Sequence, residues 1–195
     1  WHASYDEEKR FKKQKVAQNL KKAGLDVTLN DVVSTDNFIG YRNKAQYPVR
    51  EQNGQIAVGF YRNGTHTVIE GECKIQPAIF ERIARRIKEL MTEFGISAYN
   101  EISGKGTLRH IYLRTNRDES QIMLCLVVNG SFNVKKAFFD ILTEEFGQIT
   151  TICINYNNDK TNVILGKRYD VVYGNGTITD TLCGKQFKIS PQSFY

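Results

Sequence analysis

The sequence predicts an α+β fold in which antiparallel sheets carry helices on one face. The order strand, strand, helix occurs twice along the chain, and a glycine follows each helical segment. Short strand-like runs are separated by glycine-containing turns, which is typical of antiparallel hairpins. Strands grouped with helices in this way favour helices on one face of a mostly antiparallel sheet. A helix before the two β-β-α units and hairpins after them complete the predicted fold.

The 195-residue chain has the composition of a globular protein, with 41% hydrophobic and 25% charged residues. Its net charge of +6 favours a polyanionic partner, although many proteins with such a charge never bind nucleic acid. No apolar run is long enough to span a membrane and no secretory leader is recognisable, so we expect a cytoplasmic protein without membrane contact. The chain starts at Trp1 rather than methionine and ends directly after a strand-like run, so we expect it to be part of a longer polypeptide.

The first expected element is a helix that begins after Ser4 and ends at Gly24. Ser4 and Glu7 have the spacing of a capping box, and glycine is a common residue just after a helix. Lys9 and Lys12 fall on the same stripe as the apolar residues, so only the ends of this helix have a surface to pack on a core. Either the lysine stems cover apolar surface, or the helix packs on a domain outside this chain.

The first β-β-α unit is marked by Asn-Gly dipeptides at residues 53–54 and 63–64. These dipeptides separate three strand-like runs and predict a meander with primed turns. A helix is then predicted from Pro77 to Gly95, because apolar residues recur at three- and four-residue spacing. Its inward residues are Phe80, Ile83, Ile87, Leu90, Met91 and Phe94.

The second unit and the C-terminal part follow the same signals. Strands over residues 109–115 and 121–128 are expected to pair, and a helix over residues 134–146 to follow them. Further strands are then predicted, over residues 149–155, 162–165, 169–173, 177–182 and from 187 onward. The runs on either side of the glycine-containing turn at residues 174–176 are expected to form a hairpin.

The four cysteines form no C-x-x-C pair, so no self-contained zinc or redox motif is present. Cys125 and Cys153 lie in apolar strand-like runs and are expected to be buried thiols. The three histidines show no spacing that favours a Ser/His/Asp arrangement, and no glycine-rich nucleotide-binding turn occurs. The sequence therefore predicts no hydrolase site and no complete cofactor site.

Two strand-like runs carry basic and polar side chains on one face. In the first, Arg42, Lys44 and Gln46 alternate with apolar or aromatic neighbours, so the three should share one face of an extended chain. Such a face can contact phosphates or base edges, and it can equally be the solvated face of an outer strand.

The second such run covers residues 109–114, where His110, Tyr112 and Arg114 alternate with apolar residues. We take Arg109, His110 and Arg114 as a second set of RNA-contact candidates, because such side chains pair with phosphates and stack on bases. A solvent-facing antiparallel strand is the alternative.

Four segments together resemble one family of enzymes. They are WHASY and the helix that follows it, GYRNKAQ at residues 40–46, LRH at 108–110 and FKISPQSFY at 187–195. In this order they resemble the bacterial RNA uracil-5-methyltransferases, most closely the 23S ribosomal RNA branch. Motifs of this combined length are more specific than a basic patch.

The resemblance implies a domain organisation. Family members have an N-terminal OB-like RNA-binding domain, a central domain with a 4Fe–4S cluster on four cysteines, and a C-terminal domain that binds S-adenosylmethionine. The chain resembles the central domain: residues 1–25 would be a helix packing on an absent domain, 26–186 the RNA-positioning domain, and 187–195 the start of the methyltransferase domain. Cys73 matches one cluster ligand, whereas the other three lie upstream of the segment matching Trp1, so no cluster is expected on this chain.

The resemblance also places the chemistry outside this chain. In the family a cysteine thiolate adds to C6 of uracil, C5 attacks the cofactor methyl group, and a base removes the C5 proton. None of the four cysteines lies in the Asp-Pro-Pro-Arg-like segment that carries the nucleophile, and the chain ends one residue before a cofactor-contacting glutamine. We therefore expect a chain that positions ribosomal RNA and is inactive alone. Transfer RNA as the substrate, a stand-alone RNA-binding module and a protein-interaction domain are the alternatives.

Overall fold

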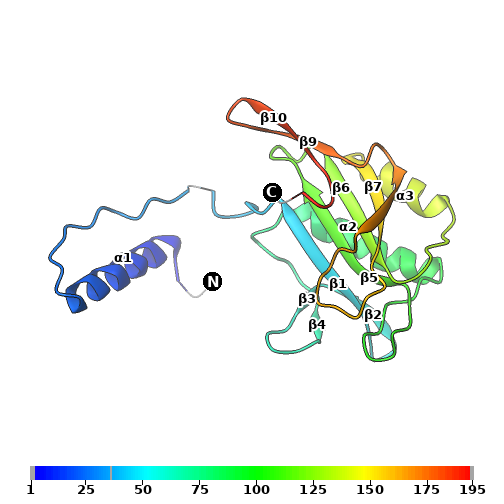
Figure 1. The fold of residues 1–195 in the computed structure, drawn as a ribbon, viewed down its shortest axis with the longest axis horizontal. Helices are drawn as coiled ribbons and strands as arrows, with labels where there is room; N and C mark the ends of the chain where they lie inside the picture. The colour runs from blue at the N-terminus through cyan, green and yellow to red at the C-terminus, as the bar shows by residue number, and fades with distance from the viewer. Residues whose placement is uncertain (1–2, 36, 194–195) are drawn as a thin grey trace. The chain divides into compact units, whose positions relative to one another are not determined.

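The computed structural model describes residues 3–35 and 37–193. The chain divides into two compact units, residues 1–38 and 39–195 (Figure 1). The boundaries predicted at residues 25 and 186 stay predictions.

The first unit contains helix α1 (Tyr5–Lys22) and an extended segment. The Glu7 backbone N–H donates to Ser4 Oγ (3.3 Å) and the Ser4 N–H donates to the Glu7 carboxylate (2.9 Å), so the predicted capping box is confirmed. Gly24 follows the helix with a φ of +73°. No residue of α1 is buried, as expected for a helix whose lysines share the apolar stripe.

A six-stranded sheet forms the centre of the second unit, in the order β2-β1-β5-β6-β7-β8. Its strands are β1 (Lys44–Gln52), β2 (Gln55–Val58), β5 (Leu108–Thr115), β6 (Ile122–Val128), β7 (Ile149–Tyr156) and β8 (Arg168–Tyr173). Neighbours pair antiparallel except β6 and β7, which are parallel and joined through α3 (Ala137–Glu145). A parallel pair needs such a crossover. The α+β class is confirmed.

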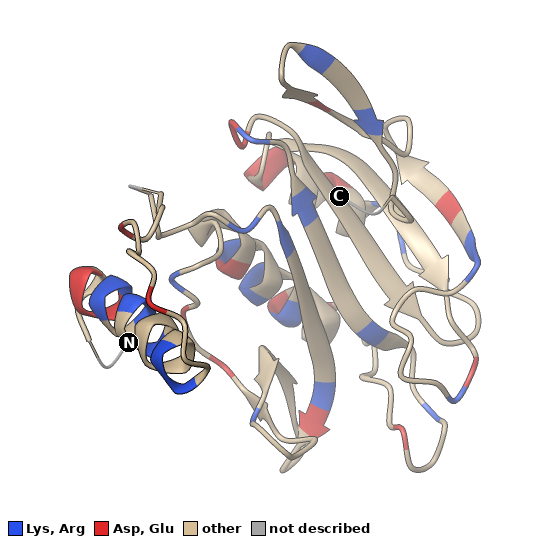
Figure 2. Cartoon of the chain, turned by 60° about the vertical axis from the view of Figure 1, so that its left-hand side comes forward, with Lys and Arg blue, Asp and Glu red and all other residues tan. Residues whose placement is uncertain are grey.

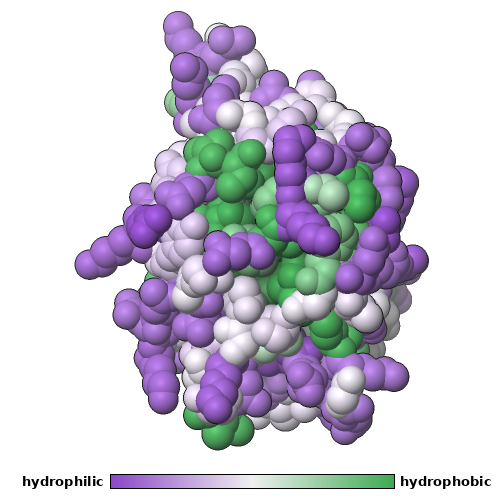
Figure 3. All heavy atoms as spheres, turned by 90° about the vertical axis from the view of Figure 1, so that its right-hand side faces the viewer, coloured by the Kyte–Doolittle hydropathy of each residue, from purple (hydrophilic) through white to green (hydrophobic). Residues whose placement is uncertain are grey.

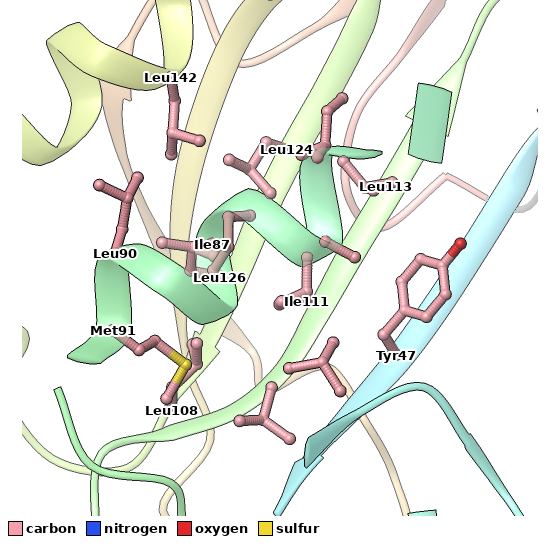
Figure 4. Close-up of a cluster of buried hydrophobic side chains, with 14 of the residues drawn as sticks. Tyr47, Ile87, Leu90, Met91, Leu108, Ile111, Leu113, Leu124, Leu126 and Leu142 are labelled. Carbon is pink, nitrogen blue, oxygen red and sulfur yellow. The ribbon is translucent and has the colours of Figure 1, made fainter. Parts of the chain in front are cut away.

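Both helices of this unit, α2 (Ala78–Glu93) and α3, cover the same face of the sheet (Figure 1). Ile87, Leu90 and Met91 of α2 belong to the core, where Met91 points toward Leu108 of the sheet and Leu90 toward Leu142 of α3 (Figure 4). All the predicted inward residues of α2 are buried except Phe94, which packs at the edge of the core. The helical periodicity of the sequence therefore identified the core face correctly. The second predicted helix begins at Ala137, three residues later than expected.

The predicted three-stranded meander is correct only in its first turn. Asn53 and Gly54 both have positive φ (+52° and +75°), as a type I′ turn requires. The next run is split at Gly59, so that β2 pairs with β1, whereas β3 (Phe60–Tyr61) pairs with β4 (Val68–Ile69) in a separate sheet. A Cβ at Gly59 would lie 2.1 Å from the Ile69 carbonyl oxygen, so the split depends on a close backbone approach. At the second Asn-Gly pair only the glycine has positive φ, so this turn is not of the predicted primed type.

The predicted hairpin across residues 174–176 is wrong. β8 pairs with β7, whereas β9 (Ile178–Leu182) pairs with β10 (Lys185–Ile189) around Cys183 and Gly184. The N–H of Gly176 donates to Thr151 Oγ1 on β7 (2.8 Å), which directs the chain away from β8. Sequence-local turn signals could not distinguish these two pairings.

The strand predicted over residues 162–165 is also absent from the described chain. The Asn157 side-chain amide donates to the carbonyls of Val163 (2.7 Å) and Ile164 (3.0 Å), so this segment is a loop folded on Asn157. Such side-chain bonds compete with strand pairing.

No helix in the described ranges is long and apolar enough to cross a membrane. Apolar side chains do reach the surface of the chain. Figure 3 shows them as green patches interrupted by polar side chains on the side that lies to the right in Figure 1.

Candidate nucleic-acid interface

The segment that leads into β1 is held in place by backbone hydrogen bonds. The N–H of Gly40 donates to the Lys74 carbonyl (2.9 Å), and the N–H of Arg42 donates to the Ile75 carbonyl (2.9 Å). Gly40 has a φ of +64°, a conformation that glycine adopts without strain. The backbone of this segment is therefore ordered, although it belongs to no strand.

β1 then alternates as the sequence predicts. Ala45 and Tyr47 belong to the core beneath the helices, which places Lys44 and Gln46 on the opposite face, where both are half-buried. Arg42 precedes the strand and is exposed. The predicted alternation is confirmed for Lys44 and Gln46.

Arg42 and Lys44 are the two cations at the start of β1. Among the described residues, no Asp or Glu forms an ion pair with either of them. Lys44 lies opposite Arg114 of β5 in the antiparallel register, so two cations are neighbours on one face. Figure 2 shows lysine and arginine residues on the long strands of the sheet.

Three of the four basic residues of α2 are different, because carboxylates neutralise them, whereas Arg82 lies over the ring of Phe146. Arg85 pairs with Glu81 (2.6 Å), Arg86 with Glu145 (2.9 Å) and Lys88 with Glu70 (2.8 Å). The helical face therefore offers less uncompensated charge to a polyanion than the start of β1.

A hollow of about 600 Å³ lies beside the ordered segment. Its lining includes Gly40, Tyr47, Cys73, Lys74, Gln76 and Arg82. The hydroxyl of Tyr47 donates to Gln76 Oε1 (2.8 Å), and burial raises the pKa of Tyr47, so that this hydroxyl stays protonated. Sequence reasoning missed Lys74, because only the backbone pairing brings it next to Gly40.

Cys73 is half-buried and has no further thiolates with it. Cys125 and Cys153 face each other in β6 and β7 and are buried, and Cys183 is exposed in the turn between β9 and β10. The described part of the chain has no group of three or more His, Cys, Asp or Glu residues that could hold a metal ion. The donor set of this chain therefore does not fit a cluster that needs four thiolates.

The two β-strand cysteines behave as the sequence predicts. Burial raises the pKa of the Cys153 thiol to about 11 and also raises that of Cys125. Both are neutral thiols in the sheet, which confirms the prediction of buried cysteines.

β5 is buried along its whole length, so the open face expected on this strand is absent. Tyr112, Cys125 and Cys153 on the face away from the helices pack with Leu165 and Tyr169. Residues distant in sequence thus cover β5, although the sequence of this strand alternates between polar and apolar residues. The alternative of a solvent-facing strand is wrong for the same reason.

The candidate contacts on β5 have partners within the chain. Arg109 Nη1 donates to the carbonyls of Asn157 (2.6 Å) and Asp159 (2.9 Å), and Arg114 Nη1 donates to the Ser193 carbonyl (2.8 Å). His110 is only 8% exposed. RNA contact by these three residues stays a prediction.

The chain was compared with proteins of known sequence and structure to find the class of protein that it resembles. No protein-family model matches the chain. It is 44% identical over 201 positions to an uncharacterized RNA methyltransferase of Clostridium acetobutylicum, and 37% identical to those of Clostridium tetani and Oceanobacillus iheyensis. Each alignment covers the whole chain and 43% or 44% of the relative, so the chain spans a little under half the length of the curated relatives it matches.

The fold is also found in a solved structure. The chain superposes with a TM-score of 0.76 on the Pyrococcus abyssi tRNA (uracil-54, C5)-methyltransferase in complex with S-adenosyl-L-homocysteine, at 24% identity. The match covers the whole chain and 44% of that protein. The chain is therefore similar along its whole length to segments of bacterial RNA methyltransferases, which confirms the predicted resemblance to this family, whereas the 23S ribosomal RNA branch stays a prediction.

Proposed function

We propose that the chain is the central segment of an S-adenosylmethionine-dependent 23S ribosomal RNA uracil-5-methyltransferase, and that it positions the RNA while other segments perform methyl transfer. The names of the bacterial relatives support RNA as the substrate. The four matching sequence segments favour the ribosomal branch. The substrate named for the structural neighbour makes transfer RNA the second candidate.

The observation that carries this proposal is the contrast between the cations at the start of β1 and most of those on α2. Arg42 and Lys44 lack carboxylate partners among the described residues, whereas three basic residues of α2 are paired. Arg42 and Lys44 would contact phosphates, and the amide of Gln46 a base edge or a sugar. A phosphate between Lys44 and Arg114 would also relieve the repulsion between these two cations.

Arg109, His110 and Arg114 come second as proposed RNA contacts. Arg109 and Arg114 would have to exchange their present carbonyl partners before they could bind phosphate. In the proposal they mainly hold the surface beneath the RNA in shape.

The intact protein would act in the cytoplasm and bring S-adenosylmethionine and the catalytic cysteine from other segments. Cys73 would act as one ligand of a 4Fe–4S cluster only if three more cysteines came from outside this chain. This chain alone would not methylate RNA.

The contact assignment is tested by comparing two double variants of equal charge. Arg42→Ala with Lys44→Ala should weaken binding to a uridine-containing ribosomal RNA fragment, and should lower the slope of log K against log salt by about 1.4. Arg85→Ala with Lys88→Ala removes the same charge from paired residues and should change the binding much less. Equal effects of the two variants would contradict the assignment.

Running the same titration with transfer RNA would separate the two candidate substrates. Tighter binding of transfer RNA at equal salt would favour the second candidate. A non-catalytic RNA-binding module would instead bind RNA without any methylation by the intact protein.

A further inference from the structure

A second group of basic side chains lies at the other end of β1, on the face away from the helices. The Arg50 side chain is 8% exposed, and its guanidinium donates to the Tyr61 hydroxyl and to the Glu101 carboxylate. His66 Nδ1 lies 3.2 Å from the second Glu101 oxygen. Arg50 and His66 thus meet at one carboxylate, and Tyr61 joins the group through Arg50.

The surroundings of Arg50 hold more positive than negative charge. His110 lies opposite Pro48, two residues from Arg50 on the same face of β1. Burial lowers the pKa of His110 to about 3, and the guanidiniums of Arg50 and Arg109 contribute to this shift. Among the described residues, Arg50 Nε, Arg109 Nε and His110 Nδ1 are buried without a hydrogen-bond partner. Glu101 is the carboxylate that pairs with this group. The unpaired nitrogens and the excess of positive charge both favour an anionic ligand.

Aromatic rings hold both guanidiniums in fixed orientations. Arg50 lies over the ring of Tyr61 (5.3 Å), and Arg109 lies over the ring of Tyr99 (4.4 Å). A stacked guanidinium keeps its N–H edge available for carboxylate or phosphate oxygens. The His66 side chain is 82% exposed and its ring packs edge-on against Tyr61, so aromatic surface for a base lies beside the cations.

Glu101 reaches this group from a short, well-ordered turn. Asn100 Oδ1 accepts hydrogen bonds from the N–H groups of Ile102 and Ser103, both at 2.9 Å. The Glu101 side chain is 39% exposed and can therefore move into solvent when another anion takes its place. Carboxylate and phosphate oxygens accept the same arginine donors.

We infer that the group formed by Arg50, Tyr61, His66 and Glu101 is a phosphate-binding site, and that Glu101 occupies the position of an RNA phosphodiester until RNA displaces it. The choice of RNA as the source of the phosphate rests on the proposed function, whereas binding of a phosphate group does not. Arg50 is six residues from Lys44 on the same face of β1, about 20 Å away, so the two sites could engage one RNA molecule.

The test replaces Glu101 and uses a matched acid as the control. Glu101→Gln removes the competing charge, and Glu145→Gln removes the same charge from the Arg86 pair on the helical side. Glu101→Gln should bind a single-stranded RNA oligomer on the order of tenfold more tightly, and its slope of log K against log salt should steepen by about 0.7. Equal affinities of the two variants would overturn the inference.

A titration with inorganic phosphate distinguishes a site that binds any phosphate group from one that binds RNA. In a titration of Glu101→Gln followed by NMR, phosphate should shift the imidazole signals of His66 and His110, and the same titration of Glu145→Gln should leave them unchanged. Unshifted signals in both variants would overturn the site. Shifted signals without any gain in RNA affinity would overturn the assignment to RNA.

A further variant separates this inference from the proposed function. His66→Ala, at an exposed position, should cancel part of the gain in RNA affinity of Glu101→Gln. If Arg42→Ala with Lys44→Ala weakens RNA binding but Glu101→Gln behaves as Glu145→Gln, this inference alone fails. If neither variant nor the unmodified chain binds RNA but phosphate still shifts the histidine signals, the proposed function fails and the anion site remains.

Discussion

Lys44 on β1 lies directly opposite Arg114 on β5, so two cations are cross-strand neighbours on the face of the sheet away from the helices. Like charges at such positions destabilise a sheet unless an anion lies between them. Arg114 has partners of its own, including the Ser193 carbonyl, but Lys44 still faces a cation at the end of β1 where RNA is proposed to bind.

This arrangement predicts opposite effects on stability and binding. Lys44→Gln should raise the free energy of unfolding by about 0.5 kcal/mol, because the repulsion from Arg114 disappears. The same variant should weaken RNA binding. Urea unfolding and RNA titration measure the two effects.

Lys88→Gln is the control for that prediction. It breaks the pair with Glu70 (2.8 Å) and should slightly lower stability while leaving RNA binding unchanged. A loss of stability in Lys44→Gln as well would show that Lys44 does not suffer repulsion.

The buried position of His110 predicts that the chain loses stability at acidic pH. Burial, with Arg50 and Arg109 nearby, lowers its pKa from 6.5 to about 3, so the folded chain excludes a proton that the unfolded chain binds. This contribution to stability is present above pH 6.5 and is lost as the pH falls from 6.5 toward 3. The slope is at most about 1.4 kcal/mol per pH unit.

A variant without His110 separates the contribution of His110 to the pH dependence of stability from that of the carboxylates. Between pH 7 and pH 5, the unmodified chain should lose about 2 kcal/mol more stability than His110→Gln. Equal losses in the two proteins would show that His110 titrates normally in the folded state.

Burial in the core determines how much the free energy of unfolding falls when a side chain is replaced by alanine. Ile87 is fully buried between α2 and the sheet, so Ile87→Ala should lower the free energy of unfolding by about 3 kcal/mol. Val33, which is 99% exposed, should tolerate alanine within about 0.5 kcal/mol. Denaturant unfolding of the two variants checks this contrast.

Local signals in the sequence predicted much of the fold. The Ser4 and Glu7 capping box, the I′ turn at Asn53 and the core face of α2 each depend on residues a few positions apart. Such features follow from hydrogen bonding and periodicity within one element. The sequence was therefore sufficient for most elements and for the α+β class, but it wrongly predicted a strand over residues 162–165.

Contacts between distant residues could not be predicted in this way. The pairing of β8 with β7 depends on a Gly176 bond to Thr151, and the cover over β5 comes from residues such as Leu165. The ion pair of Arg50 with Glu101 joins residues that are 51 positions apart. The sequence thus identified the side chains of the first candidate site but neither the burial of the β5 residues nor the second site.

This chain is proposed to position RNA for methyl transfer performed by other segments, and methylation by the intact protein is the decisive measurement. Mass spectrometry of ribosomal RNA incubated with S-adenosylmethionine should detect 5-methyluracil with the intact protein and none with residues 1–195 alone. In the intact protein, Arg42→Ala with Lys44→Ala should raise KM for RNA far more than it lowers kcat. Methylation by residues 1–195 alone, or an unchanged KM in the double variant, would contradict the account.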